Sequence, residues 1–305
     1  MQQDAERVTD ARIARGWNIE RVKLAPGLYV VATPIGNLAD VTLRALSVLA
    51  SADLVLCEDT RITRRLLDRY GLRPQLLAYH EHNAASVRPR VLAKLGEDET
   101  VALVSDAGTP LISDPGYKLV QAAIEAGQRV FPVPGASAAL AALVAAGLPT
   151  DRFLFDGFLP AKAGQRKTRV AELADIPATL VLYESGPRLA ASLADLANGL
   201  GARDAAICRE LTKKFEEVRR GTLAQLAAHY LETGAPKGEI VIVIAPPGAE
   251  ANAVSPEALD TKLKAALKKL SVKDAADAIA GETGLKRRHV YQRALALADR
   301  PEKKK

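Results

Sequence analysis

An apolar run leads directly into a loop rich in Gly and Pro in the segment Val101-Ala102-Leu103-Val104-Ser105-Asp106-Ala107-Gly108-Thr109-Pro110-Leu111-Ile112-Ser113-Asp114-Pro115-Gly116. Four consecutive apolar residues bounded by turn residues are typical of a strand buried on both faces. Glycine in the loop lets a ligand approach the backbone, and proline limits the conformations that the loop can adopt. The segment therefore predicts a buried strand that carries a ligand-binding loop.

Other apolar runs flank this segment and alternate with helical patterns. Continuous apolar strands separated by helices indicate a parallel sheet covered on both faces, so the first domain is predicted to be α/β. The further strands are expected at Leu28–Ala32, Asp53–Cys57 and Arg129–Val133, and the helices at Thr42–Ala50, Thr60–Tyr70, Val87–Leu95 and Tyr117–Ala126.

The second half of the chain repeats this alternation. Strands are expected at Phe153–Phe155, Thr179–Tyr183, Ala205–Cys208 and Glu239–Ala245, and helices at Ser137–Ala146, Lys167–Ala174, Leu189–Leu200 and Leu223–Glu232. The polar, basic stretch Ala161–Arg169 is expected to be a mobile loop. A chain of 305 residues suggests about two domains. We expect an extension at 1–26, α/β domains at 27–135 and 136–247, a linker that ends at Val254, and a helical appendage at 255–300.

Composition excludes several classes of protein. A hydrophobic fraction of 48% argues against global disorder. The apolar run Ala138–Leu148 is about half as long as a membrane span, and acidic residues before Lys23 argue against a signal peptide. Cys57 and Cys208 match no disulfide or metal-ligand spacing. We expect a soluble protein of the cytoplasm.

The basic charge is concentrated at the C-terminal end. The chain has 42 Lys and Arg against 36 Asp and Glu, and residues 255–305 alone hold 13 against 7, so residues 1–254 are balanced at 29 against 29. The end also predicts two helices around Gly284, with Ala275, Ala276, Ile279, Val290, Tyr291 and Leu295 as a small core. A localised basic segment with this pattern resembles a nucleic-acid-binding helix-turn-helix, and a plain helical hairpin is the alternative.

Four loops that follow strands are rich in Gly, Pro and short polar residues. They are Thr33–Leu38, Ser105–Gly116, Pro132–Ala138 and Tyr183–Arg188. Ligands of open parallel sheets bind beyond the carboxyl ends of the strands, so these loops predict a small-molecule site. None of the loops contains Gly-x-Gly-x-x-Gly or Gly-Lys-Ser/Thr. A dinucleotide site and a nucleoside-triphosphate P-loop are therefore not supported.

Together with Gly147–Phe153 and Arg209–Lys213, these motifs resemble, in order, those of the tetrapyrrole-methylase-like (class III) methyltransferases. Within that family the chain resembles the branch that methylates the ribose 2′-oxygen of a cytidine in the decoding region of 16S rRNA. The resemblance covers about Gly27 to Ala245 and implies two α/β domains with a cofactor cleft between them, S-adenosylmethionine as the cofactor, and a homodimer. The branch more often has Pro-His where this chain has Gly186-Pro187.

The resemblance also implies where the cofactor binds. Backbone groups of the Ala107–Thr109 turn are expected to hold the methionine part, while Ile112 and Leu211 provide apolar walls for the adenosine. The full set of expected cofactor contacts is Pro34, Ser105, Asp106, Ala107, Gly108, Thr109, Ile112, Ser137, Ala138 and Leu211. No metal is expected, because a sulfonium methyl donor requires none.

A ribose hydroxyl is a weak nucleophile, so a proton acceptor is expected beside it. Glu58 follows a predicted strand, and its position resembles that of an acidic proton acceptor in relatives that act on tetrapyrroles. His80 and Glu81 form a second candidate cluster. Alternatively, Glu58 or Asp59 pairs with Arg61 or caps the following helix.

Basic side chains that can follow RNA phosphates occur beside the predicted cleft and in the appendage. The candidates are Arg61, Arg64, Lys162, Arg166, Lys167, Lys286, Arg287, Arg288 and Arg293. The expected substrate partner is 16S rRNA or the small ribosomal subunit. The alternatives are a methyltransferase for a tetrapyrrole or another small molecule, and a non-catalytic RNA-binding assembly factor.

Overall fold

The computed structural model describes residues 19–248, 256–283 and 287–298. A five-stranded parallel sheet in the order β3-β2-β4-β1-β5 forms the first α/β unit. Its strands are β1 (Gly27–Val31), β2 (Leu54–Cys57), β3 (Leu76–Ala78), β4 (Thr100–Val104) and β5 (Val130–Val133). The predicted parallel strands are confirmed, and β3 was missed because only three residues of it pair with β2.

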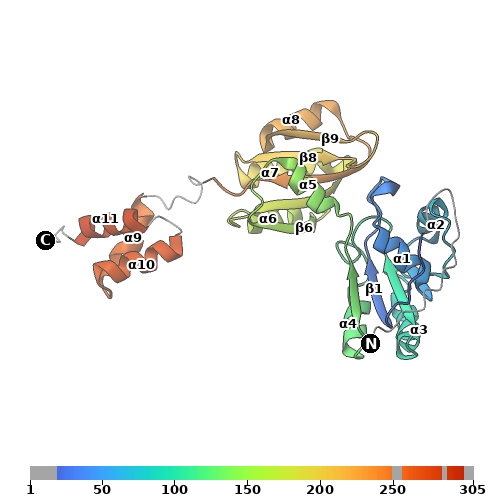
Figure 1. The fold of residues 1–305 in the computed structure, drawn as a ribbon. Coiled ribbons are helices and arrows are strands. Elements are labelled where there is room, and N and C mark those ends of the chain that lie inside the picture. The colour runs from blue at the N-terminus through green and yellow to red at the C-terminus, as the bar shows by residue number, and fades with distance from the viewer. Residues whose placement is uncertain (1–18, 249–255, 284–286, 299–305) are drawn as a thin grey trace.

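Helices cover both faces of this sheet (Figure 1). Alternate residues of a strand point to opposite faces, so Tyr29 packs with α1 and α2 while Leu28 packs with α3 and α4. The helices are α1 (Leu43–Ser51), α2 (Thr60–Arg69), α3 (Ala84–Gly96) and α4 (Tyr117–Glu125). Because the sheet is buried on both sides, ligands can approach it only at the ends of its strands.

The second sheet is mixed rather than parallel. Its order is β6-β7-β10-β8-β9, and β6–β7 is the one parallel pair of neighbouring strands in this sheet. The strands are β6 (Phe153–Phe158), β7 (Thr179–Ser185), β8 (Asp204–Arg209), β9 (Glu217–Thr222) and β10 (Glu239–Ile244). Strand β9 was missed by the sequence prediction because it is polar and lies at the sheet edge, where it pairs only with β8.

One helix covers one face of the second sheet and three cover the other. Helix α5 (Ala138–Ala146) packs on the face that carries Val181 and Cys208. The opposite face is covered by α6 (Ala163–Leu173), α7 (Gly186–Leu200) and α8 (Leu223–Thr233). The expected mobile loop at Ala161–Arg169 is wrong, because α6 begins at Ala163 and buries Arg166 and Val170.

The described residues of the appendage, 256–283 and 287–298, form the helices α9 (Pro256–Leu267), α10 (Val272–Thr283) and α11 (Arg287–Ala298). They surround a core of Leu259, Leu263, Ala276, Ile279, Val290 and Ala294. Ala275 is also buried and Tyr291 packs on the edge of this core. The expected core position of Leu295 is wrong, because its side chain is exposed. The predicted linker from Ala249 and the turn at Gly284 lie outside the described residues.

The N-terminal extension is described from Ile19 onward. Ile19 and Leu24 pack against the first sheet, and the backbone N–H of Val22 donates to the Ser51 hydroxyl at 2.9 Å. The division at residues 135 and 136 stays a prediction, which the packing of α5 on the second sheet supports. Among the described residues, no helix combines the length and the apolar character that crossing a membrane requires.

Candidate active site

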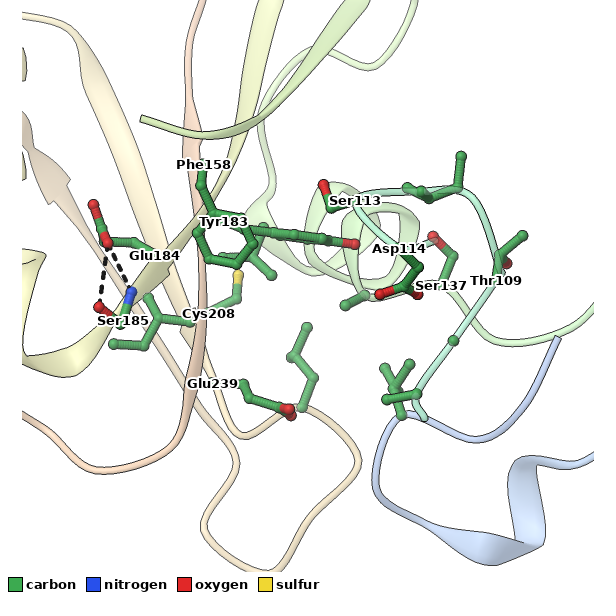
Figure 2. Close-up of a pocket in the computed structure, with 18 of the residues that line it drawn as sticks. Thr109, Ser113, Asp114, Ser137, Phe158, Tyr183, Glu184, Ser185, Cys208 and Glu239 are labelled. Atoms are coloured by element: carbon green, nitrogen blue, oxygen red, sulfur yellow. Dashed lines mark hydrogen bonds between the residues drawn. The ribbon is translucent and has the colours of Figure 1, made fainter. Parts of the chain in front are cut away.

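A cavity of about 370 Å³ lies where loops of the first sheet face the strands and loops of the second. That volume falls within the range of small-molecule pockets, which is roughly 300–1,000 Å³. Figure 2 shows the Thr109–Asp114 loop on one side, and Phe158, Tyr183 and Glu184 on the other. The cavity is therefore built from segments far apart in the sequence.

The loop after β4 forms one wall and is fixed by hydrogen bonds to the loop after β1. Thr33 and Gly108 exchange backbone hydrogen bonds, at 2.8 Å from the Thr33 N–H and 3.1 Å from the Gly108 N–H. The Ser105 hydroxyl donates to the Gly108 carbonyl at 3.1 Å. The Thr109 hydroxyl donates to the Ala136 carbonyl at the same distance. These bonds hold the turn in one shape before any ligand arrives.

The same loop contains backbone conformations that side chains rarely adopt. The φ angles of Leu111 and Ser113 are 73° and 64°, and Gly116 at the end of the loop has a φ of 130°. Such conformations persist only where the surrounding structure enforces them, and they concentrate at functional sites. The strain turns Ile112, Ser113 and Asp114 toward the cavity, where all three line the wall.

The opposite wall comes from the second sheet and is largely apolar. The Tyr183 ring is in edge contact with Phe155 and Phe158, with ring centroids 4.9 and 5.5 Å apart. Cys208 is buried in this wall, and burial raises the pKa of its thiol to about 11. It therefore packs as a neutral thiol rather than acting as a nucleophile at neutral pH.

Three carboxyl groups from two loops, those that follow β2 and β4, act on one another. Burial raises the pKa of Asp114 to about 6, and the Glu58 charge adds to the rise. Burial also raises the pKa values of Glu58 and Asp106, and in Glu58 the charge of Asp106 acts in the same direction. The backbone N–H of Asp59 donates to Asp106 at 3.0 Å. The cavity thus has an electronegative side that favours a cation.

Most of the expected cofactor residues lie on the cavity wall. Those that line it are Asp106, Ala107, Gly108, Thr109, Ile112, Ser137, Ala138 and Leu211. Pro34 and Ser105 do not line it, although both are buried behind the wall. All three residues of the Ala107–Thr109 turn, which is expected to hold the methionine part of the cofactor, line the cavity.

Sequence reasoning missed twelve residues of the wall, most of which belong to the second sheet and its loops. The missed lining residues are Ile35, Ser113, Asp114, Phe158, Tyr183, Glu184, Ser185, Cys208, Gly238, Glu239, Ile240 and Val241. Three of the four loops singled out from their composition contain Ile35, Ser113, Asp114 and the β7 residues, so the signal was present there. The β10 residues carry no such signal, because an apolar strand has the same sequence whether or not it lines a site.

The expected catalytic residues occupy different surroundings. Glu58 lies beside the cavity, where its charge acts on Asp114, and His80 faces Glu58 closely enough to lower the pKa of that carboxyl. Asp59, rather than Glu58, caps α2 and pairs with Arg61 at 2.6 Å. Glu81 is exposed and is absent from the cavity wall. No group of three His, Cys, Asp or Glu in the described residues is placed to hold a metal ion.

Some of the residues expected to contact RNA are exposed without an ion pair among the described residues, and others form ion pairs within the protein. Arg64, Lys162, Lys167 and Arg288 are exposed, whereas Arg61, Arg287 and Arg293 are exposed but engaged with Asp59, Asp277 and Asp260. The expectation that Arg166 contacts RNA is wrong, because Arg166 is buried and its guanidinium pairs with Asp195. Lys286 lies outside the described residues.

Comparison with known proteins agrees with this architecture. Residues 27–227 match the model of the family described as Tetrapyrrole (Corrin/Porphyrin) Methylases, and residues 253–298 match that described as the RsmI C-terminal HTH domain. Among solved structures, uroporphyrin-III-C-methyltransferase from Thermus thermophilus superposes with a TM-score of 0.52 and 25% identity, over 72% of this chain and 94% of that one. Fold, composition of the site and family match therefore define a class III methyltransferase.

The sequence relatives are closer. Ribosomal RNA small subunit methyltransferase I of Mesorhizobium japonicum is 56% identical over 90% of this chain and 94% of its own. The protein of the same name from Escherichia coli O157:H7 is 46% identical over 88% and 94%. The chain belongs to the tetrapyrrole methylase family, within the group of these ribosomal RNA small subunit methyltransferase I proteins. The expectation of an enzyme that uses S-adenosylmethionine is thereby confirmed.

Proposed function

We propose that this protein transfers a methyl group from S-adenosylmethionine to the 2′-oxygen of a cytidine ribose in the decoding region of 16S rRNA. The observation that carries the proposal is the high identity to rRNA methyltransferases along nearly the whole chain, appendage included. Uroporphyrin-III-C-methyltransferase from Thermus thermophilus matches a smaller share of the chain, 72%. An RNA substrate is also consistent with the excess of positive charge at the C-terminal end.

The cavity fits S-adenosylmethionine in size and in chemistry. Apolar side chains of Ile112 and Leu211 provide surfaces for an adenine ring, and the Ala107–Thr109 backbone offers hydrogen-bonding groups. Glycine at position 108 has a φ of 83°, and an added Cβ would lie 3.2 Å from the Ile35 side chain. A side chain there would be strained and would crowd the turn. The carboxyl groups of Asp106 and Asp114 favour the positively charged sulfonium.

When bound, S-adenosylmethionine supplies an activated methyl group. The work of the protein is then to hold the ribose oxygen in line with that group and to accept its proton. Placing both reactants in a cavity between two rigid sheets removes much of the entropy cost of their meeting. The carboxyl groups of Asp106 and Asp114 line the cavity and are chemically suited to accept that proton.

RNA contacts are proposed for exposed basic side chains of the body and the appendage. Arg64, Lys162 and Lys167 are exposed on the body, and Arg288 is exposed on α11. Lysine and arginine supply most of the affinity for RNA by neutralising phosphates. We also propose that the protein acts as a homodimer in the cytoplasm, where its ribosomal substrate is assembled.

The test is methyl transfer from labelled S-adenosylmethionine to small ribosomal subunits and to naked 16S rRNA, followed by mapping of the modified nucleotide. The subunits must come from cells that lack the modification. A ribose methyl on one decoding-region cytidine is the expected result. A tetrapyrrole substrate is assayed in parallel, and methylation of that substrate without any labelled RNA would overturn the proposal.

A further inference from the structure

Four carboxylates line the cavity, and they differ in the partners that surround them. Glu184 is buried and accepts a hydrogen bond from the Ser192 hydroxyl at 2.5 Å, with the Arg188 guanidinium 3.3 Å away. Glu239 pairs with the Lys213 ammonium at 2.6 Å, and Asp106 accepts the Asp59 N–H. Within the described part of the chain, Asp114 forms no ion pair. Its side-chain hydrogen-bond partner is the Ser105 hydroxyl, and a single such partner leaves lone pairs of the carboxylate available to a ligand.

The surroundings of Asp114 keep its charge uncompensated. The charges of Glu58 and Asp106, in the loops after β2 and β4, act on it, and His80 acts on Glu58. From the second sheet the Tyr183 phenol points toward Asp114 across the cavity (Figure 2). Asp114 is thus repelled by two acids, and no cation acts on it in the described part of the chain, which makes it a good proton acceptor.

We propose that Asp114 is the catalytic base that accepts the proton of the ribose 2′-hydroxyl. Glu58 is then a positioning residue, whose negative charge acts on Asp114 from outside the cavity wall. The proposal rests on the function proposed above. As the proton passes to the Asp114 carboxylate, the ribose oxygen bonds to the methyl carbon. The carbon–sulfur bond breaks with its electron pair left on sulfur, so charge and atoms balance without any further reactant.

This assignment differs from the expectation that Glu58 itself is the base. Glu58 is not among the residues that line the cavity, whereas Asp114 is. Its strained loop also holds Asp114 in place, with positive φ angles at Leu111 and Ser113 on its N-terminal side and at Gly116 on its C-terminal side. A base must reach the proton that it removes, and of the two acids only Asp114 meets that condition here.

The first experiment compares Asp114→Asn with the wild-type protein in single-turnover methyl transfer to rRNA. A general base contributes about 100- to 10,000-fold, so the rate at pH 7.5 is expected to fall at least about 100-fold. Binding of S-adenosylhomocysteine, measured by calorimetry, is expected to change less than about threefold. Glu232→Gln, an exposed carboxylate on α8, is the matched control and leaves both values unchanged.

The second experiment separates Asp114 from Glu58 by pH. The wild-type rate is expected to rise about tenfold per pH unit up to about pH 6 and then to level off, because the deprotonated form is the active one. Glu58→Gln removes a repelling charge, so the rising limb moves to lower pH while the plateau rate stays within about threefold. A Glu58→Gln plateau lowered as far as that of Asp114→Asn would instead make Glu58 the base and overturn the proposal.

A third readout does not depend on turnover. Carboxyl carbon NMR of protein labelled in aspartate is expected to contain one resonance that titrates near pH 6 and is missing from Asp114→Asn. Two outcomes would overturn the role of Asp114 while leaving the proposed function in place. One is methyl transfer by Asp114→Asn at more than a third of the wild-type rate. The other is a loss of rate matched by an equal loss of cofactor affinity. No methyl transfer to RNA by the wild-type protein overturns the proposed function instead.

Discussion

The guanidinium Nε of Arg166 lies 2.7 Å from a carboxylate oxygen of Asp195, and both side chains are only about a tenth exposed. The pair joins α6 to α7 beneath a surface that also carries the exposed Lys162 and Lys167. A second Arg166 nitrogen donates to the Ala161 carbonyl at 3.3 Å and so fixes the start of α6. In this basic stretch, Arg166 thus stabilises the fold, whereas Lys162 and Lys167 are accessible to a binding partner.

Removing one partner of this pair is expected to destabilise the protein strongly. Arg166→Ala leaves the Asp195 carboxylate buried without a counter-charge, which typically costs about 3–5 kcal/mol. The free energy of unfolding from urea titration measures the loss. Lys167→Ala, one residue along on the exposed face, is the control and should change it by less than about 0.5 kcal/mol. A stable Arg166→Ala protein with weakened RNA binding would restore Arg166 to the RNA surface.

Sequence patterns predicted the parallel sheet well because its strands are apolar on both faces, as in Val101–Val104. They failed at Ala161–Arg169 because a helix on the protein surface carries mostly polar residues, and within this stretch of α6 only Arg166 is buried. Loop composition also located the wall that contains Asp114. It could not rank Glu58 below Asp114, since that ranking depends on which carboxylate the strained loop turns into the cavity.

Gly186 is expected to tolerate no side chain. A Cβ at this position would lie 1.8 Å from the Pro236 carbonyl oxygen, which is backbone and cannot turn away. Pro236 precedes Gly238 and Glu239 of the cavity wall, so Gly186→Ala should both destabilise the fold by about 1–3 kcal/mol and weaken S-adenosylhomocysteine binding. Calorimetry and urea unfolding measure the two effects.

The control for this change is another helical glycine. Nothing lies within 4 Å of a Cβ added to Gly164 in α6, so Gly164→Ala should be neutral or stabilising by up to about 1 kcal/mol. Equal behaviour of the two variants would show that the segment around Pro236 moves aside freely.

The arginines of α11 are expected to contribute unequally to RNA binding. Arg293 pairs with Asp260 of α9 at 2.6 Å and Arg287 pairs with Asp277 of α10, whereas Arg288 is exposed and forms no ion pair within the described residues. Arg288→Ala should weaken rRNA binding and lower the salt-dependence slope by about one, because one phosphate contact is lost. Arg293→Ala should mainly lower the stability of the appendage.

Filter binding at several salt concentrations, with circular dichroism melting of the full chain, separates these effects. Deletion of 255–305 gives the reference, with weaker RNA binding and unchanged binding of S-adenosylhomocysteine. RNA binding that survives this deletion intact would place the RNA surface on the body instead, around Arg64 and Lys162.

The carboxylate of Asp114 is expected to reduce the stability of the fold at neutral pH. Its folded pKa is raised to about 6 from an ordinary value of 3.8, so the folded state disfavours the charged form. The penalty is absent below about pH 4, grows between pH 4 and 6, and is complete above pH 6. A rise of about two pKa units corresponds to at most about 3 kcal/mol. Asp114→Asn removes this penalty and should therefore be more stable than wild type at pH 7.5, with a smaller gain at pH 4.5.

Urea unfolding at these two pH values measures the difference, and Asp151→Asn, at an exposed position, is the matched control. A gain that is the same at both pH values would mean that the Asp114 pKa is not raised. If Asp114→Asn is more stable but loses methyl transfer, the Asp114 carboxylate lowers the free energy of unfolding while raising the rate of reaction. That trade-off is expected of an active-site residue.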